Sequence, residues 1–518
     1  MSLTLGPKVA QGPRVNTSPA SRRPKPPTHP GQPLPTQPTQ PRSSRFRANH
    51  FIRSVLMMGA GSAMAQALAI SFSPLLTRLY TPADFGKLAL FSSILALYFP
   101  FCSLKLEMAI PLESDEKKAN SLTDLCLFLL WVNTGLASLF VFLFAEIIAQ
   151  SLGFPALAPY LWCLPLAVLG GGATQILTSR ATRDRHYNFV SRAITIRAGG
   201  QGLLQTLLAV LFTAGAPFLI LGLTFSHLAA AFSLRRSLKR PPFVYAPKSW
   251  RTIAGQHRNF IYYSILGSFL GVASIHAIPP LLAALIDLES MGHFSLAMRM
   301  LGMPAMLIGS AIAQVFYPEA ARIKEDRHAS ALMLGSLAIR LLSLALCIYG
   351  LLAIHAVEIF VFVFGEPWKI AGELAVILSL GFLANFVSSP LSSYVYLHQR
   401  QRQQLLFSFL ILMARTGAVT LGAWWGGLYG AMIGYSFVST INAFLWVSWV
   451  LRLAGVSPWT WLCEHLKLLL TLVSLLSMIA LFAHLTDGQL WPLSLFLGAI
   501  VCAFPLLPLF KPSPATPY

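Results

Sequence analysis

The sequence has few charged side chains, and acidic ones are especially scarce. Asp, Glu, Lys and Arg make up 11% of the 518 residues, whereas hydrophobic residues make up 55% and the mean hydropathy is +0.64. Soluble proteins carry about 25% charged residues. A water-soluble body of this size needs far more polar surface, so the apolar excess must face lipid. The composition excludes a soluble enzyme and predicts an all-α polytopic membrane protein.

The motifs of metal and nucleotide chemistry are missing as well. The six cysteines form no C-x-x-C pair and have no neighbouring His at ligand spacing, so we expect them to pack in the core. The glycine clusters at 170–172 and 199–202 lack the lysine of a phosphate-binding loop and favour close helix contacts instead. His227 and His276 stand alone in apolar runs, where hydrogen-bonded packing is favoured over a proton relay. We therefore expect no metal site, no cofactor and no ATPase domain.

No acidic residue precedes Asp84, and the N-terminus is rich in Pro, Lys and Arg. Residues 1–47 cannot build a core, so they are predicted to form a disordered, basic, cytoplasmic tail, and they fit neither a signal peptide nor a transit peptide. The net charge of +20 is compatible with nucleic acid, with anionic lipid or with the positive-inside bias of a membrane protein. The positions of the charges favour the last of these and exclude nucleic acid.

About fourteen transmembrane helices are expected from runs of roughly 20 apolar residues. The expected spans are 54–76, 88–110, 122–149, 156–178, 198–214, 217–234, 261–283, 292–316, 331–352, 370–397, 404–424, 428–451, 466–485 and 490–510. They divide the chain into an N-lobe of six helices at 48–240, a cytoplasmic linker at 241–260, a C-lobe of six helices at 261–452, and two extra helices with a short tail at 453–518.

The distribution of basic residues predicts that both termini are cytoplasmic. Only Arg78, Lys87 and Lys369 fall in outward loops, and Arg299, Arg340 and Arg415 fall inside predicted spans. The other Lys and Arg residues, including those at 180–197, lie on the inward side, as the positive-inside rule requires. The outward connections are short, so function is expected within the bilayer.

The two lobes are predicted to be parallel repeats. Aligning Pro74 with Pro280 at an offset of 206 residues also pairs Gly86 with Gly292 and several leucines. An offset spanning six helices returns the chain to the same side of the membrane, which is the arrangement of transporters with a cavity between two lobes.

Candidate residues for that cavity are the cationic and polar side chains within spans. An Arg inside a span costs about 2.5 to 3.5 kcal/mol on insertion scales, so it pairs, faces water or serves a function. Cationic groups in a cavity suit an anionic headgroup such as a pyrophosphate. The candidates for the headgroup are Arg415, Arg299, Arg340 and Arg78, and those for the polar lining are Ser62, Gln66, Ser73, Ser295 and Asn385. The candidates for coupling to H+ or Na+ are Glu107, Asp124 and Glu146, for which a solvated helix end is the alternative.

Three segments resemble the polysaccharide repeat-unit flippases of the Wzx type, within the multidrug/oligosaccharidyl-lipid/polysaccharide exporter superfamily. They are SPLLTRLYTPADFGKLALFSSI with LEMAIPLESDEKKANSL, then PPLLAALIDLESMGHFSLAMRMLGMPAMLIGSAIAQVFYPEAA, and FGEPWKIAGELAVILSLGFLANFVSSPLS. The resemblance covers about residues 50–450. Two features depart from the family pattern: the extra C-terminal helix pair and the Pro-rich tail.

The resemblance implies a flippase of the bacterial inner membrane that moves a polyprenyl-pyrophosphate-linked oligosaccharide. The cargo would serve the assembly of surface polysaccharides such as the O-antigen of lipopolysaccharide. Transport would proceed by alternating access and without covalent chemistry. Membrane lipids and a glycan polymerase or other assembly machinery are the implied partners. Arg78, the Arg of the motif LTRLYTP, serves either the pyrophosphate or the cap of the first helix. The alternatives are a drug/cation antiporter, a flippase for the lipid-linked peptidoglycan precursor, and a membrane glycan polymerase or ligase.

Overall fold

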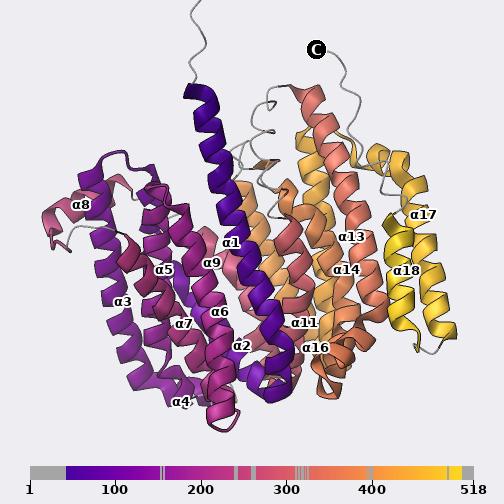
Figure 1. Cartoon of the computed structure of the whole chain (residues 1–518), viewed down its shortest axis with the longest axis horizontal. Helices are drawn as coiled ribbons and strands as arrows, with labels where there is room; N and C mark the ends of the chain where they lie inside the picture. The colour runs from indigo at the N-terminus through magenta and orange to yellow at the C-terminus, as the bar shows by residue number, and fades with distance from the viewer. Residues whose placement is uncertain are drawn as a thin grey trace, which may run out of the picture. The chain divides into compact units, whose positions relative to one another are not determined.

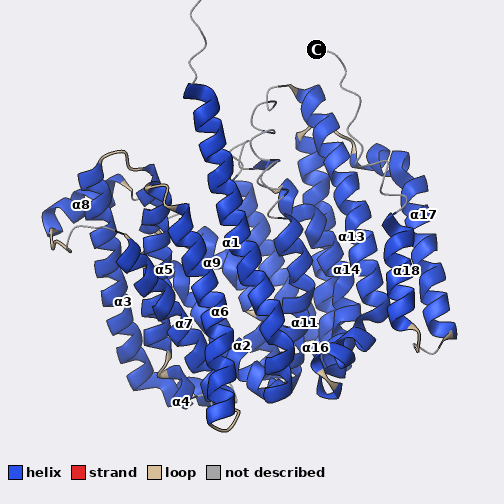
Figure 2. Cartoon of the chain, in the orientation of Figure 1, coloured by secondary structure: helices blue, strands red, loops and turns tan. Residues whose placement is uncertain are grey.

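The computed structural model describes residues 43–503 except 152–154, 156–157, 239–242, 258–263, 310–311, 313–315, 317–319, 321–322, 324–325, 393, 396–400 and 487–488. Every regular element in this part of the chain is a helix (Figure 2), which confirms the predicted all-α class. The chain divides into two compact units, Met1–His50 and Phe51–Tyr518, and the second is the helical body. Most of the predicted tail at 1–47 lies outside the described residues.

Figure 1 labels most of the helices, and the short 3-10 or π-helical segments are named η in the text. In chain order they are α1 (Ser43–Leu79), α2 (Pro82–Tyr98), η1 (Phe99–Phe101), η2 (Leu106–Leu112), α3 (Glu116–Ser151), α4 (Ala158–Leu161), α5 (Leu164–Arg183), α6 (Tyr187–Leu211), α7 (Ala216–Ser237), α8 (Pro247–Gln256), α9 (Ile265–His276), α10 (Ile278–Leu285), α11 (Leu288–Pro304), η5 (Ala305–Gly309), α13 (Arg327–Phe364), η6 (Glu366–Trp368), α14 (Lys369–Leu391), α16 (Gln401–Leu453), α17 (Pro458–Leu485) and α18 (Trp491–Ala503).

Nine of the described helices are long and apolar enough to cross a membrane, or up to ten if the bent pair α9–α10 is one span. One of the nine, α16, consists of two helical arms that meet at Gly426 and Gly427, where the backbone is not helical and Gly427 has φ +58°. Only glycine adopts that conformation readily, so the predicted spans at 404–424 and 428–451 are separated at this point. The count of fourteen spans remains a prediction.

The predicted repeat appears in the helix boundaries. Both ends of α11 lie 206 residues after the corresponding ends of α2, and each helix has 17 residues. The N-caps are equivalent too: the Thr81 hydroxyl accepts a hydrogen bond from the Asp84 N–H, and the Asp287 carboxylate accepts one from the Ser290 N–H. Side-chain caps satisfy backbone donors that would otherwise lack partners at a helix start.

The two equivalent helices pack against each other at their equivalent glycines. A Cβ on Gly86 would overlap the carbonyl oxygen of Leu288, and a Cβ on Gly292 would overlap the carbonyl oxygen of Pro82. Pro82 and Leu288 also correspond at the offset of 206 residues. The contact is therefore reciprocal, as it must be across a two-fold axis, and it lets the backbones of α2 and α11 approach closely.

The buried hydrophobic residues form two large clusters that follow the two halves of the sequence. One cluster draws mainly on residues 90–253 and the other mainly on residues 278–461. The second cluster also takes in Leu76, Tyr80 and Phe85 from the α1–α2 corner, so this corner packs into the C-terminal half.

The C-terminal pair α17–α18 is anchored on α13. Trp461 donates its indole N–H to the carbonyl of Gly335 at 3.0 Å, and the Ser494 hydroxyl lies 2.9 Å from Nε2 of the buried His355. Among the described helices, and apart from their contact with each other, α17 and α18 both pack mainly on α13 of the C-terminal half. The pair is therefore attached to the C-terminal half.

Candidate functional site: a cationic cavity between the two halves

A cavity of about 270 Å³ lies where helices of the N-terminal half meet helices of the C-terminal half. Its walls come from α1 and α6 on one side and from α11 and η5 on the other. The polar side chains that line it are Ser62, Gln66, Arg197, Gln201, Gln205 and Arg299. Three of these six, Ser62, Gln66 and Arg299, belong to the predicted cavity set.

Arg299 reaches across the cavity wall from α11 to α1. Its Nη2 donates a hydrogen bond to the carbonyl oxygen of Ala69 at 3.3 Å. The amide of Gln66 lies 3.3 Å from the sulfur of Met306, so a second contact also joins α1 to the C-terminal half. A guanidinium has five N–H donors, and this bond to Ala69 uses one of them. The others are the means by which Arg299 can bind an anion in the cavity.

Arg197 is the cavity cation that the sequence analysis missed. The apolar run that begins at residue 198 predicts an inward segment for Arg197, but α6 begins at Tyr187 and carries Arg197 on its cavity face. The missed signal is the spacing of Arg197, Gln201 and Gln205, which recur every four residues and therefore share one face of a helix. Gln205 is buried, and its side chain donates to the carbonyl of Leu219 at 2.7 Å.

The lining of the cavity is cationic. Arg197 and Arg299 enter from opposite halves of the chain, and no Asp or Glu belongs to the described lining residues. Two like charges beside one cavity repel each other when the cavity holds only water, and a bound anion relieves that repulsion. The arrangement is suited to a ligand with two or more negative charges.

Arg415 lies elsewhere, inside the C-terminal half. Its Nε donates to the Ser439 hydroxyl at 3.1 Å and its Nη1 to the carbonyl of Ser274 at 3.1 Å, and the guanidinium lies 5.1 Å from the centre of the Tyr435 ring. It does not line the cavity. These bonds tie the two arms of α16 to each other and to α9.

The other predicted cations and polar residues are also outside the cavity lining. Arg340 is half-buried in α13, Arg78 is exposed at the end of α1, and Asn385 is exposed in α14. The buried Ser73 and the half-buried Ser295 donate to carbonyl oxygens of their own helices, at 2.7 and 3.2 Å. The structure thus brings Arg299 together with Ser62 and Gln66, and separates them from the rest of the predicted set.

The predicted ion-coupling carboxylates are distributed over the N-terminal half. Glu107 is buried, accepts a hydrogen bond from Ser103 and lies 3.5 Å from Lys105. Asp124 is buried and accepts a hydrogen bond from the N–H of Val244 at 3.4 Å, and Glu146 is exposed on α3. None of the three belongs to the cavity lining. The described residues contain no group of three or more metal-ligating side chains.

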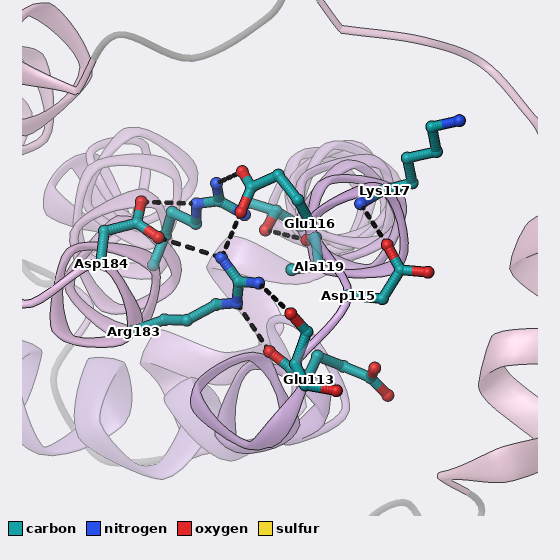
Figure 3. Close-up of polar contacts among 10 residues, drawn as sticks. Glu113, Asp115, Glu116, Lys117, Ala119, Arg183 and Asp184 are labelled. Atoms are coloured by element: carbon teal, nitrogen blue, oxygen red, sulfur yellow. Dashed lines mark hydrogen bonds and ion pairs between the residues drawn. The ribbon is translucent and has the colours of Figure 1, made fainter.

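A second charged cluster joins the start of α3 to the end of α5 (Figure 3). Glu116 pairs with both Arg180 and Arg183, and Arg183 also donates to the carbonyl of Glu113 at 2.8 Å. The Glu113 side chain lies 2.9 Å from Nε2 of His257, which follows α8. The cluster therefore fixes α3 and α5 of the N-terminal half to each other, and the Glu113–His257 contact ties the segment after α8 to them.

Solved structures with this arrangement of helices are membrane transporters. The chain is similar to a structure titled lipid II flippase MurJ, inward closed conformation, with a TM-score of 0.63, 13% identity and coverage of 89% of this chain and 98% of that one. It is also similar to an inward-facing multidrug resistance MATE family transporter of the MOP superfamily, with a TM-score of 0.56, 13% identity and coverage of 77% and 95%. The chain is thus a multi-pass membrane protein with the fold of these structures.

Sequence comparison identifies the family. The family described as polysaccharide biosynthesis protein matches residues 75–373, which is more than half of the chain. The chain belongs to this family. It is also 26% identical over 411 residues to the succinoglycan biosynthesis transport protein ExoT of Rhizobium meliloti (strain 1021), covering 74% of this chain and 76% of that protein. These findings confirm the predicted family resemblance.

Proposed function

We propose that the protein is a flippase that moves a polyprenyl-pyrophosphate-linked oligosaccharide across the bacterial inner membrane for surface polysaccharide assembly. The family match and the likeness to ExoT support a role in polysaccharide transport. The observation that carries the proposal is the cavity between the halves, to which each half contributes one arginine and whose described lining contains no carboxylate.

The cargo chemistry follows from the charges of the cavity. A diphosphate taken out of water needs its charge matched by donors, and arginine provides charge and directed N–H groups together. Arg197 and Arg299 would hold the two phosphates, and the amides of Gln66 and Gln201 would bind hydroxyl groups of the adjoining sugar. The polyprenyl chain would remain in lipid, where its burial costs nothing.

The volume limits what the cavity holds in this state. Sites for drug-sized ligands measure about 300 to 1,000 Å³, so 270 Å³ takes a diphosphate with little more than its first sugar. The rest of a glycan would extend beyond the cavity, on the side from which the headgroup enters. Separation of the halves on the opposite side would then release the headgroup.

The orientation and domain assignment belong to the same proposal. We place both termini in the cytoplasm from the positions of Lys and Arg. The N-lobe at 48–240 and the C-lobe at 261–452 are the moving halves, and the helices after residue 452 act as an attachment to the C-lobe. H+ or Na+ coupling and contact with a glycan polymerase or assembly machinery complete the proposed system.

A drug/cation antiporter is the second candidate, because the MATE transporters share the fold. Such a cargo requires anionic groups in the cavity, and the cavity here carries two cations. A flippase for the lipid-linked peptidoglycan precursor fits the same charges, since that cargo also carries a diphosphate. The relative transport rates of the two lipid-linked cargoes therefore distinguish this alternative from the leading proposal.

The test is transport by purified protein in proteoliposomes loaded with fluorescent polyprenyl-pyrophosphate glycans. Arg197→Ala and Arg299→Ala should each reduce the initial rate about tenfold or more, which corresponds to losing about 1.4 kcal/mol of binding or more. Arg192→Ala is the matched control, because Arg192 is an exposed arginine of the same helix α6. Parallel vesicles with the peptidoglycan precursor or with a cationic dye measure the alternatives. Unchanged rates for both cavity variants would refute the proposal.

A further inference from the structure

The end of the molecule at which α2 and α11 begin contains a buried junction between the two halves. Trp368 of η6 is fully buried and donates its indole N–H to the carbonyl oxygen of Thr77, at the end of α1, at 3.0 Å. The same indole contacts the ring of Phe85 on α2 edge-on, with centroids 5.0 Å apart. On its other side lies the ring of His293 on α11, with centroids 5.6 Å apart. We call these four residues the Trp368 junction.

His293 is buried there without the partners that an imidazole normally has. Its exposed fraction is 1%, and neither ring nitrogen has a hydrogen-bond partner among the described residues. Nε2 lies 3.8 Å from a carboxylate oxygen of Glu289, which is too far for a hydrogen bond. Buried polar groups without partners are rare because they cost free energy, so this imidazole requires an explanation.

The charged groups around the ring are unable to stabilise a proton on it fully. Glu289 is largely exposed, with 65% of its side chain accessible, so water screens its attraction. The neighbouring carboxylates accept hydrogen bonds from other groups: Asp287 from Ser290, Glu373 from Tyr429, and Asp84 from Ala216. Other charged residues on the packed elements are Lys87 on α2, which lies 4.0 Å from Asp84, Glu366 on η6 and Lys369 at the start of α14. Arg78 follows Thr77 at the end of α1, and Arg299 lies further along α11.

We propose that His293 is a proton-binding site whose protonation opens the Trp368 junction. A neutral imidazole fits the closed junction, whereas an imidazolium, whose nearest carboxylate oxygen is 3.8 Å away on the exposed Glu289, is better solvated when the junction is open. Water reaches His293 when Trp368 and the α1–α2 corner separate. Proton binding therefore favours the state in which the halves are parted at this end, and proton release lets the junction close.

The proposed proton site is separate from the cargo cavity, because it lies at the Trp368 junction. It gives a physical route for a proton to drive the conformational cycle, since a ligand shifts an equilibrium by its differential affinity for the two states. The proton here binds the open state better than the closed one. His293 does not line the transport cavity, so coupling would pass through the packing of α11 against α2.

The experiment measures the distance across the junction by double electron–electron resonance. Spin labels are attached at Arg78→Cys and Glu366→Cys, two exposed positions on opposite sides of the junction, in a variant with the six native cysteines replaced. In the parent, lowering the pH from about 8 to about 5 should raise the ratio of long to short distances at least fivefold, a change that requires only a modest difference in proton affinity between the states. His293→Gln should make the distances independent of pH. His328→Gln, which changes an exposed histidine of α13, should leave the parent response intact.

The variant Trp368→Phe tests the Trp368–Thr77 contact separately from the protonation of His293. This variant keeps an aromatic ring but loses the hydrogen bond to Thr77, so the long distances should gain population at every pH while the pH response remains. The proposal is overturned if the parent distances do not change with pH or if His293→Gln keeps the parent response. It is also overturned if Trp368→Phe leaves the distances as they are in the parent. If His293→Gln does not fold, the distance distributions of the parent and of Trp368→Phe as a function of pH still test the proposal.

Discussion

Arg299 and Arg415 lie in apolar helices of the same half, yet their side chains are held in different ways. Arg415 donates to Ser439 and Ser274 and lies over the ring of Tyr435. Arg299 donates to Ala69 alone among the described residues and lines a cavity beside Arg197. A guanidinium whose donors meet protein acceptors joins helices, whereas one with donors directed at a cavity is available to a ligand. The depth of an arginine within a span therefore does not show whether it joins helices or binds a ligand.

The largest effect should come from removing both cavity cations. The double variant Arg197→Ala, Arg299→Ala should lower glycan-lipid transport more than either single variant, and therefore by more than about tenfold, which corresponds to about 1.4 kcal/mol. Transport rates of the two single variants and the double variant form a double-mutant cycle. If both arginines bind one diphosphate, the cycle shows a coupling of about 0.5 to 3 kcal/mol. Additive losses would mean that the two act on separate parts of the cargo.

Arg415→Ala should show the opposite pattern. Losing two hydrogen bonds in the packed half should destabilise the protein by about 1 to 3 kcal/mol, seen as a lower thermal unfolding midpoint in detergent. Transport per folded molecule should stay within about twofold of the parent, since this side chain does not line the cavity. Arg197→Ala provides the contrast: its midpoint should stay equal or rise, because a repulsion within the cavity is removed. A stable but inactive Arg415→Ala would break the comparison.

Inorganic pyrophosphate should stabilise the parent protein. At 100 times its dissociation constant, a ligand of the folded state adds about 2.7 kcal/mol, so the unfolding midpoint should rise with concentration. Arg415→Ala should show the same increment from its lower starting value, and the double cavity variant should show none. Equal increments in all three proteins would place the anion outside the cavity.

The smallest effect is expected from Gln201→Ala. A neutral amide that binds a sugar hydroxyl contributes about 0.5 to 1.5 kcal/mol, so transport should fall between about twofold and tenfold. The change should alter preference among glycans with different first sugars more than it alters the maximal rate. Gln205→Ala is the matched structural variant, because its amide bonds Leu219. That variant should lower the unfolding midpoint instead.

The sequence predicted the fold well, because composition and periodicity report directly on burial in lipid. The offset of 206 residues fixed the correspondence of α2 and α11, and the structure reproduces it at both helix ends and at both caps. The number of spans was harder to predict, since apolar run length does not reveal a bend such as the one between α9 and α10.

The site was predicted less completely, and the reasons are physical. A hydropathy scan begins a span only after the last charged residue that precedes the apolar run. It therefore placed Arg197 outside the span, although Arg197 lies within helix α6. Depth singled out Arg415, but the acceptors that bind it come from residues 24 and 141 positions away. His293 and Trp368 could not be singled out from the sequence, because Trp368 bonds Thr77, which lies 291 positions away, and meets the ring of His293 from another helix. Long-range partners of this kind follow from the tertiary packing alone.

The glycines that join α2 and α11 have a further consequence. A surface that fits its own copy is what a symmetric pair of identical chains uses to associate, and the Gly86–Gly292 contact has this form within a single chain. The molecule thus has, within one chain, the contact geometry of a homodimer. The two halves nevertheless differ in chemistry, since the first supplies Arg197 to the cavity and the second supplies Arg299.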